Sequence, residues 1–364
     1  MAPLVKVLKN DPNFAVIVAV TAQHRDMLDQ VLELFEIIPE YDLNIMKQGQ
    51  SLVDITTRVL EGLNDVFAIE KPDIVLVHGD TTTTFAAALT AFYNQVAIGH
   101  VEAGLRTFNK AEPFPEEINR RLTGTMADLH FSPTARAKGN LLLEGVKPEH
   151  VFVTGNTVID ALIPQVDKNY RFTDPVLQNL DFSKPIILGE AHRRENLGQP
   201  LEDIFQAMLD IVNTNENVEL VYSVHPNPRV KETAQRILAK HKRIRLIDPP
   251  SYKEWVNLMA RSYLLLTDSG GLQEEAPSLG VPVLVLREVT ERPEGLRTGT
   301  LKLVGTRRDK ITSQTQALLN NSKEYQSMKE APNPYGDGKA SQRIKAALLY
   351  YFQGLEKPQD YIVE

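Results

Sequence analysis

The chain has 364 residues, enough for about two domains, and its 42% hydrophobic and 24% charged residues are typical of a globular protein rather than a disordered one. Forty basic and 47 acidic residues leave a formal charge of −7, which argues against general nucleic-acid binding. The absence of Cys excludes a disulfide scaffold, thiolate zinc ligands and a thiol nucleophile. The sequence contains no apolar run long enough to span a membrane and does not open with a secretory-signal pattern, so we expect a soluble, cytoplasmic protein.

The first half of the chain alternates between short β-branched runs and longer helical patterns, which indicates βαβ units and a parallel sheet. Residues 1–8 have the pattern of a helix that follows no strand. The expected strands are 16–21, 74–78, 96–101, 129–132 and 151–154, with a long helix over 52–70. These strands are nearly continuous apolar runs, as expected when helices cover both faces of a sheet.

The alternation breaks around residues 163–184, where Pro164, Pro175 and the following Pro185 mark the expected domain junction. A second series of strands is expected at 186–189, 218–224, 244–247, 263–267 and 281–286. A last helix over 341–352 either closes the second domain or crosses back to the first. We therefore predict an α/β protein of two doubly wound domains with a central cleft, spanning 1–160 and 161–346, with a segment from about 347 to 364 as a candidate to pack back on the first domain.

Polar residues follow two expected strands of the first half, where ligands bind in open parallel sheets. One strand is followed by Gly79, which allows close backbone approach, and by Asp80, which is either a functional carboxylate or a helix N-cap. Another ends at Glu102, and the next helix begins with Glu116 and Glu117, a pair that helix-capping charge alone would explain. Because Asp80, Glu102 and Glu116 come from successive loops of one sheet, they could meet and perform acid and base chemistry.

The second half has two comparable strand ends. His192 opens a His-Arg-Arg cluster directly after a strand, and such a cluster suits an anion such as diphosphate, with a solvated surface loop as the alternative. Ser269, Gly270 and Gly271 begin a helix and would present backbone N–H groups to a phosphate. Glu275, one turn further on, could accept hydrogen bonds from ribose hydroxyls.

Two further strand ends, at His225 and Arg292, carry polar loops that are either surface or part of a site. Metal binding is disfavoured, because the eight histidines form neither an i, i+4 pair nor a His-Glu-x-x-His motif. The glycine triplet of a dinucleotide-binding turn is also missing, which disfavours NAD chemistry. We expect neither a metal nor a cofactor.

Seven motifs occur in order along the chain: His78-Gly79-Asp80-Thr81-Thr82-Thr83, His100-Val101-Glu102-Ala103-Gly104-Leu105-Arg106-Thr107, Pro113-Phe114-Pro115-Glu116-Glu117 with Asn119-Arg120, Thr154-Gly155-Asn156-Thr157, His192-Arg193-Arg194-Glu195-Asn196, Asp268-Ser269-Gly270-Gly271 and Glu291-Arg292-Pro293-Glu294. Together they resemble the bacterial non-hydrolysing UDP-N-acetylglucosamine 2-epimerases, over residues 1 to about 347. The resemblance implies a GT-B-like fold of two Rossmann-like domains and a homodimer. It also implies reversible conversion of UDP-N-acetylglucosamine into UDP-N-acetylmannosamine for cell-surface polysaccharides, without a redox cofactor. The route in that family is anti-elimination of UDP to 2-acetamidoglucal, followed by re-addition with the opposite configuration at C2.

The resemblance also implies roles for matching residues. Asp80, Glu102 and Glu116 would serve proton transfer and sugar binding, and which is acid and which is base stays open. His192 would stabilise the departing diphosphate. The implied substrate-binding residues are Arg120, Ser269, Gly270, Gly271, Glu275 and Arg292.

Some bacterial members of that family carry a second, allosteric substrate site. Its contacts are matched here by Gln23, Gln50, Glu116, Arg193 and His225. Asp26 and Gly49 stand where such members carry Gln and Arg, so the resemblance leaves allosteric activation open.

The chain departs from the family pattern in two places. Family members have a strand and a turn bearing Arg and Lys ahead of the Met1-Ala2-Pro3-Leu4 that opens this chain. We therefore expect unpaired backbone in a first domain that lacks its first strand, and weakened or absent activity. Glu190 stands where a Thr is usual, which adds negative charge beside the diphosphate site.

Three alternative functions remain compatible with these residues. A GT-B glycosyltransferase would share the fold and the UDP site but would not need three convergent carboxylates. A hydrolysing epimerase would release free N-acetylmannosamine and UDP. A non-catalytic UDP-sugar binding protein would bind without forming product.

Overall fold

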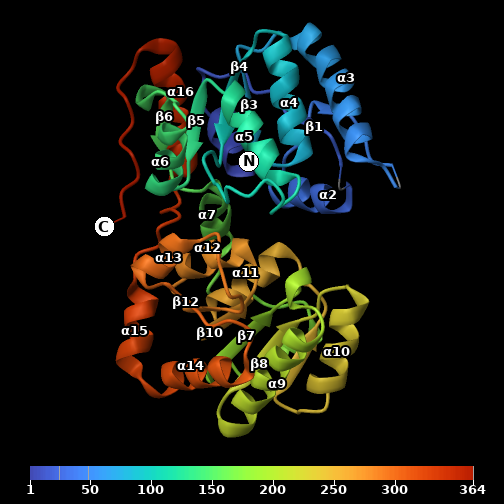
Figure 1. The fold of residues 1–364 in the computed structure, drawn as a ribbon, viewed down its shortest axis with the longest axis vertical. Coiled ribbons are helices and arrows are strands. Elements are labelled where there is room, and N and C mark those ends of the chain that lie inside the picture. The colour runs from blue at the N-terminus through green and yellow to red at the C-terminus, as the bar shows by residue number, and fades with distance from the viewer. Residues whose placement is uncertain (24, 48, 364) are drawn as a thin grey trace. The chain divides into compact units, whose positions relative to one another are not determined.

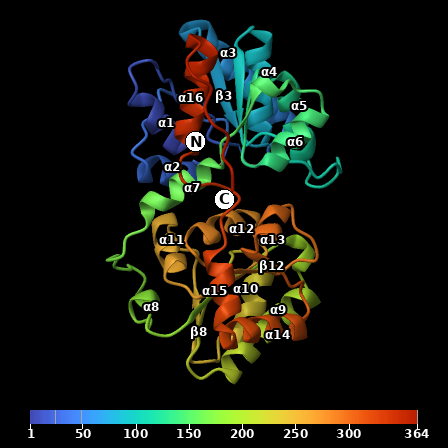
Figure 2. The ribbon, with the colours of Figure 1, turned by 90° about the vertical axis from the view of Figure 1, so that its left-hand side faces the viewer.

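The computed structural model describes residues 1–23, 25–47 and 49–363, which form two compact units, each built from parallel strands and the helices that surround them (Figures 1 and 2). The first unit comprises Met1–Ala161 and Tyr335–Ile362, and the second comprises Leu162–Pro334 together with Val363. No helix in the described ranges is long and apolar enough to cross a membrane.

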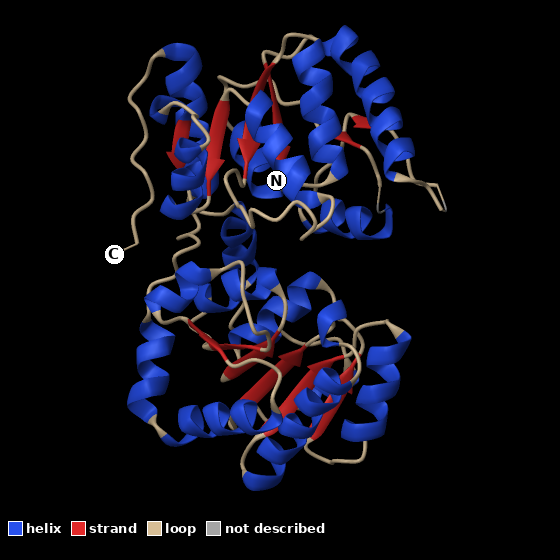
Figure 3. Cartoon of the chain, viewed as in Figure 1, coloured by secondary structure: helices blue, strands red, loops and turns tan. Residues whose placement is uncertain are grey.

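The first unit contains two separate parallel sheets. One pairs β1 (Ala19–Val20) with β2 (Tyr41–Asp42), and the other has the order β3-β4-β5-β6. The four strands of the larger sheet are β3 (Ile74–His78), β4 (Ala97–Val101), β5 (Leu129–Ser132) and β6 (Val151–Val153). Within the residues that the structure describes, β3 pairs with β4 alone, and Figure 3 shows β1 and β2 apart from the larger sheet.

The expected strand over 16–21 is only two residues long in the structure. The backbone N–H of Val18 donates to the side chain of Glu40 at 2.7 Å, whereas its carbonyl oxygen accepts from the backbone N–H groups of Glu40 and Tyr41 at 2.9 and 3.1 Å. The predictions for 74–78, 129–132 and the helix over 52–70 are confirmed at both ends.

The helices of the first unit are α1 (Ala2–Lys9), α2 (Arg25–Leu34), α3 (Leu52–Glu70), α4 (Thr82–Tyr93), α5 (Glu116–Met126), α6 (Ala135–Leu143), η1 (Pro148–His150), α7 (Thr157–Leu162) and α16 (Ala340–Gln353). The helix expected at the start of the chain is therefore present as α1. It lies beside α16 (Figure 2), and the buried side chains of Leu4 and Leu8 pack with Ile344 and Leu348. Phe131 of β5 belongs to the same cluster, so the two helices cover one face of the larger sheet.

The last helix crosses back to the first unit, which resolves the alternative left by the sequence. The return begins at Tyr335, so residues 335–346 lie in the first unit rather than in the second domain as predicted. The physical reason is local: the backbone N–H groups of Ala340 and Ser341 donate to the carboxylate of Asp160 at 3.1 and 2.7 Å, which fixes the start of α16 in that unit.

The second unit is built on one parallel sheet of six strands in the order β12-β11-β10-β7-β8-β9. Its strands are β7 (Ile186–Glu190), β8 (Glu219–Ser223), β9 (Ile244–Ile247), β10 (Leu264–Thr267), β11 (Val283–Val285) and β12 (Leu301–Leu303). The chain runs outward from β7 to β9 and then continues from β10 on the other side of β7. The border between β7 and β10 is therefore the point where strand order reverses, and ligands bind there in open α/β sheets.

The helices of the second unit are η2 (Ile163–Gln165), α8 (Pro175–Gln178), η3 (Arg194–Asn196), α9 (Gln199–Thr214), α10 (Pro228–Leu238), α11 (Tyr252–Ala260), α12 (Gly270–Ser278), α13 (Pro293–Thr298), α14 (Arg308–Asn320) and α15 (Ser322–Glu330). Side chains of each strand alternate between two buried clusters. Leu264 and Leu266 pack with α9, α10 and α14, and Leu265 packs with α8, α11 and α12. Both faces are covered, which explains the unbroken apolar runs in the sequence.

Candidate active site

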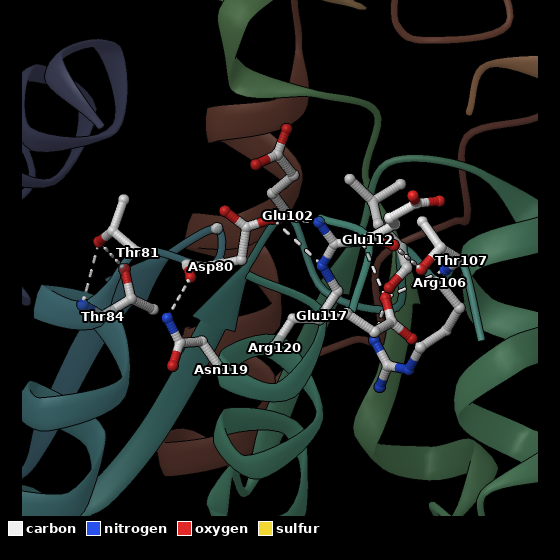
Figure 4. A network of polar contacts seen from close by, with 12 residues as sticks. Asp80, Thr81, Thr84, Glu102, Arg106, Thr107, Glu112, Glu117, Asn119 and Arg120 are labelled. Atoms are coloured by element: carbon white, nitrogen blue, oxygen red, sulfur yellow. Dashed lines mark hydrogen bonds and ion pairs between the residues drawn. The ribbon is translucent and has the colours of Figure 1, made fainter. Parts of the chain in front are cut away.

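Asp80 follows β3 and is not the N-cap of α4, so that reading of the sequence was wrong. Thr81 caps the helix, and its hydroxyl oxygen accepts from the backbone N–H of Thr84 at 3.2 Å. The Asp80 carboxylate instead pairs with Arg120, and its Oδ2 accepts from Nη2 at 2.5 Å and from Nε at 3.1 Å (Figure 4). The carboxylate is therefore held by a side-chain partner and not by the helix.

Glu102 follows β4 and lies against the turn that carries Asp80. Its Oε2 is 3.0 Å from the position that a Cβ on Gly79 would take, and Gly79 itself has a φ of 68°. A side chain at that position would be strained and would crowd the carboxylate. Asn156 donates to Glu102 Oε1 at 3.0 Å. The backbone φ of Glu102 is 62°, a left-handed conformation that non-glycine residues adopt rarely and that clusters at functional sites.

Glu117 is the fully buried member of the Glu-Glu pair at the start of α5. Its carboxylate accepts from the backbone N–H groups of Thr107 and Phe108 at 3.0 and 3.1 Å and from Arg120 Nη1 at 3.2 Å. Arg120 thus joins Glu117 to Asp80 (Figure 4). The sequence analysis singled out Glu116, which is half-buried at the first position of α5. It did not predict that Glu117 is the member of the pair that bonds Arg120 and the loop after β4.

The loop after β4 is fixed by buried contacts around Arg106. Its guanidinium makes a two-pronged ion pair with Glu144, with Nε and Nη2 at 2.8 and 2.7 Å from the two carboxylate oxygens. Gly104 has a φ of 91°, and a Cβ there would come within 2.2 Å of the Ala137 carbonyl oxygen. These constraints fix the loop that presents the backbone donors to Glu117.

In the second unit, Asp268 ties the loop after β7 to the end of β10. Its buried carboxylate accepts from the backbone N–H of His192 at 3.0 Å, from that of Arg193 at 2.9 Å and from the side chain of Asn196 at 2.8 Å. Burial raises the pKa of Asp268 against the lowering effect of these donors. Asp268 therefore positions the His-Arg-Arg cluster at the strand-order reversal, a role the sequence analysis did not assign.

His192 lies between a carboxylate and a second imidazole. Its Nδ1 is in ion-pair contact with Glu190 Oε1, and its ring stacks on that of His225 with centroids 4.5 Å apart and planes 16° apart. Contact with Glu190 raises the pKa of His192, whereas burial and the neighbouring His192 lower the pKa of His225.

The first turn of α12 combines uncapped helical backbone with two guanidinium groups. The side chain of Ser269, the N-cap residue, makes no capping hydrogen bond. The Nη2 atoms of Arg193 and Arg292 lie 3.6 and 4.0 Å from where a Cβ on Gly270 would be. Arg193 Nε is buried without a hydrogen-bond partner, and Arg292 pairs with the buried Glu274. N–H groups, the helix dipole and two cations therefore converge on a space suited to a phosphate.

Glu275 lies in α12 beyond this first turn and is 8% exposed. Burial, and secondly the charge of Glu274, raises the pKa of Glu275 to about 8. The hydroxyl of Tyr252, whose pKa Glu275 helps to raise, is buried without a hydrogen-bond partner. Unsatisfied groups of this kind are the ones that a polar ligand satisfies.

The residues matched to the allosteric site belong to different units. In the first unit, Gln23 Oε1 accepts from Thr83 at 2.9 Å and Gln50 Oε1 accepts from Arg58 at 3.3 Å. Arg193 and His225 lie in the second unit, in the cluster described above. The Asp26 side chain lies outside what the structure describes.

In the described part of the chain, one trio has ligand atoms close enough for a metal ion: Glu190, His192 and Asp268, all within 4.8 Å of one another. The carboxylate of Asp268 already accepts three hydrogen bonds, and that of Glu190 already contacts His192. Hydrogen bonds and an ion pair within the protein therefore explain why these three side chains lie close together.

Comparison with known proteins shows which family the chain belongs to. The chain matches the family model described as UDP-N-acetylglucosamine 2-epimerase over residues 6–349. The UDP-N-acetylglucosamine 2-epimerase of Bacillus subtilis is 55% identical over 359 residues, which cover 99% of this chain and 93% of that protein. An S. aureus protein solved with UDP is 50% identical, has a TM-score of 0.91 and covers 100% of this chain and 96% of its own.

The enzyme from Neisseria meningitidis, solved with UDP-GlcNAc bound, is 47% identical with a TM-score of 0.88, and the match covers 96% of this chain and 95% of that one. These similarities confirm the predicted α/β fold class of two Rossmann-like domains. They also confirm the resemblance drawn from the motifs: the chain belongs to the UDP-N-acetylglucosamine 2-epimerase family, a family of isomerases.

Proposed function

We propose that this chain interconverts UDP-N-acetylglucosamine and UDP-N-acetylmannosamine without hydrolysing them. The observation that carries the proposal is the anion-binding turn of α12, where the guanidinium groups of Arg193 and Arg292 converge beside Gly270. A nucleotide diphosphate matches the charge and the geometry of this turn. We infer the identity of the sugar, N-acetylglucosamine, from the names of the chain's relatives.

The proposed reaction proceeds by elimination and re-addition. A base removes the proton from C2, the bond from C1 to the diphosphate oxygen breaks, and UDP leaves with the bonding electrons. This forms a C1–C2 double bond in the 2-acetamidoglucal. Re-addition of UDP to C1, with a proton delivered to the opposite face of C2, gives the epimer. The C2 proton is weakly acidic, so the reaction needs positioned carboxyl groups and a stabilised leaving group.

In this proposal the first unit performs the proton transfers. Asp80 and Glu102 are adjacent, and they differ in environment: Asp80 is paired with a guanidinium, whereas Glu102 accepts from an amide. Two neighbouring carboxyl groups in distinct environments are the arrangement that an acid–base pair requires. Glu116, at the start of α5, is the third carboxylate of the proposed set.

The second unit holds the leaving group in this proposal. His192 and the α12 turn stabilise the negative charge that develops on the departing diphosphate. Glu275 accepts from, or donates to, the ribose hydroxyls, because a carboxyl group whose pKa is about 8 is largely protonated at neutral pH. No redox step is involved, which agrees with the missing dinucleotide-binding turn.

A proton NMR time course with UDP-N-acetylglucosamine in D₂O tests the proposal. We expect UDP-N-acetylmannosamine to accumulate with deuterium at C2, because the proton removed from C2 exchanges with solvent. Free N-acetylmannosamine with UDP would instead identify a hydrolysing enzyme. Product only when a sugar acceptor is added would identify a glycosyltransferase. Binding heat in calorimetry without any product would identify a UDP-sugar binding protein.

A further inference from the structure

Glu190, the last residue of β7, has a carboxylate that is engaged at both oxygens. Oε2 accepts from the hydroxyl of Thr267 at 3.0 Å, and Thr267 is the residue paired with Glu190 across β7 and β10. Oε1 is in ion-pair contact with Nδ1 of His192. Glu190 is therefore fixed by the sheet on one side and oriented toward the imidazole on the other.

This contact determines which nitrogen of His192 carries a proton. A carboxylate oxygen can only accept, so the contact is attractive only when Nδ1 of His192 is protonated. Nδ1 is buried and has no regular hydrogen bond to any other group. Nε2 is therefore the ring nitrogen left for a ligand.

With Nδ1 protonated, Nε2 can donate to an anion only when the ring carries a second proton. In a neutral imidazole with its proton on Nδ1, Nε2 has a lone pair and repels a phosphate oxygen. In the imidazolium, Nε2 carries a second proton and donates a charge-assisted hydrogen bond. A diphosphate-binding role for His192 therefore requires the doubly protonated ring.

The groups around His192 favour this state on balance. Glu190 raises the pKa of His192 most, and Asp268 at the end of β10 raises it further. Burial and the adjacent Arg193 lower it, and the imidazole of His225, after β8, faces the ring at stacking distance. The hydroxyl of Tyr222, also on β8, bonds the backbone of the residue between Glu190 and His192. The net direction is upward.

We propose that Glu190 is a positioning residue that fixes the Nδ1 proton of His192 and keeps the ring doubly protonated, so that Nε2 donates to the diphosphate of the nucleotide. This inference rests on the proposed function, because it needs a diphosphate as the partner of Nε2. Glu190 also has an electrostatic cost, since its charge opposes the ligand's charge. The benefit therefore exceeds the cost only at pH values where His192 would otherwise be neutral.

A sign change with pH follows from this balance. In Glu190→Gln the ring loses its charged partner and becomes neutral at a lower pH. At a pH between the titration midpoints of His192 in the variant and in the wild type, which ¹⁵N NMR locates, we expect UDP to bind the variant about tenfold more weakly, because the donor form is depleted. At a pH below both midpoints the ring is charged in both proteins and the repelling carboxylate is gone from the variant, so we expect equal or tighter binding. A purely structural role would weaken binding by the same factor at both pH values.

The experiment combines two measurements on the full chain. Calorimetric titration with UDP at both pH values compares the wild type, Glu190→Gln and Glu190→Asp, which keeps the charge and should restore part of the binding at high pH. Glu195→Gln is the matched control, because Glu195 lies in the same loop, pairs with Arg287 and has a side chain 53% exposed. It should follow the wild type at both pH values.

A ¹⁵N NMR titration of the ligand-free wild-type protein gives a readout that needs neither a folded variant nor activity. We expect both ring nitrogens of His192 to be protonated above the pH at which free histidine loses its proton. A ring that titrates below free histidine, or a Glu190→Gln affinity loss that is equal at both pH values, would overturn the inference. Absence of UDP binding to the wild type would instead refute the proposed function, and the NMR titration would still decide whether Glu190 sets the charge of His192.

Discussion

The two units present their functional groups in different ways. In the second unit, His192 and the α12 turn follow β7 and β10, the two strands at which the order of a continuous six-stranded sheet reverses. Topology alone locates this site. In the first unit, the larger sheet has four strands, and its carboxylates are organised by side-chain bonds through Arg120 rather than by a reversal of strand order.

The electrostatics of the two clusters differ as well. The first-unit carboxylates are compensated by Arg120 and by backbone and amide donors. The second unit has two guanidinium groups at the α12 turn and, after β7, an imidazole whose pKa is raised. The difference supports the proposed division of labour, with proton transfer assigned to the first unit and anion binding to the second. The four predictions that follow test this division, from the largest expected effect to the smallest.

Asp80→Asn should abolish most of the turnover. General acid–base groups contribute about 10²–10⁴-fold to rates, so we expect kcat to fall by about 10³-fold. Asp65→Asn, on the exposed side of α3, is the matched control and should leave the rate unchanged. The NMR time course measures both rates. Wild-type turnover in Asp80→Asn would remove this carboxylate from the mechanism.

Gly104→Ala should destabilise the first unit by about 3 kcal/mol. The new Cβ would lie 2.2 Å from the Ala137 carbonyl oxygen, and the backbone φ of 91° is unfavourable for alanine. Gly139→Ala, where a Cβ would have no heavy atom within 4 Å and no positive φ is required, should cost almost nothing. Denaturant unfolding of the two variants measures the difference. Similar unfolding free energies would show that the loop after β4 adapts more easily than its close contact indicates.

Acid should unfold the first unit before the second. Burial lowers the pKa of His100 to about 4 and that of His130 to about 3, below the 6.5 of an unfolded histidine. Above about pH 6.5 both rings are neutral in the folded and the unfolded chain, and the first unit keeps its full stability. As the pH falls toward about 4, only the unfolded chain takes up these protons, so the free energy of unfolding falls by about 3 kcal/mol for His100. The raised pKa values of Asp268 and Glu275 act in the opposite direction, because protonation of these carboxyl groups favours the folded second unit.

Hydrogen exchange followed by mass spectrometry at neutral pH and near pH 4.5 resolves the two units. We expect protection to fall first in β4 and β5, which carry His100 and His130. Equal loss of protection in β7 and β10 would contradict this difference between the units.

Gly270→Ala should weaken UDP binding by about tenfold, or about 1.4 kcal/mol, with little effect on stability. The added Cβ makes ordinary contacts of 3.6 and 4.0 Å with two guanidinium groups, so the fold tolerates it. The methyl group occupies the space where a phosphate would approach the helix N-terminus. Calorimetry with UDP measures the loss. Unchanged affinity would place the diphosphate elsewhere.

Much of this molecule could be predicted from sequence, because parallel strands covered on both faces are continuous apolar runs. The ends of β3, β5 and β9 were confirmed for that reason. The strand expected over 16–21 is shorter in the structure, where it pairs only with β2 among the described strands, because an apolar run does not reveal how many neighbouring strands are there to pair with it.

Some of the proposed functional residues could be predicted from the sequence and others could not. Asp80 and His192 could be found because they directly follow strands. Glu117 could not be separated from Glu116, since only the turn preceding α5 determines which side chain points inward. Asp268 was visible as part of a motif, but its role depends on bonds to a loop about 75 residues away, which no local pattern encodes.

The division of labour between the units is tested most directly by calorimetric titration of UDP into Asp80→Asn. The account predicts wild-type UDP affinity in this variant, although its turnover is lost, because Asp80 belongs to the proton-transfer cluster and not to the diphosphate site. An affinity that falls together with turnover would show that Asp80 is needed to bind the nucleotide, and it would contradict the assignment of the two roles to separate units.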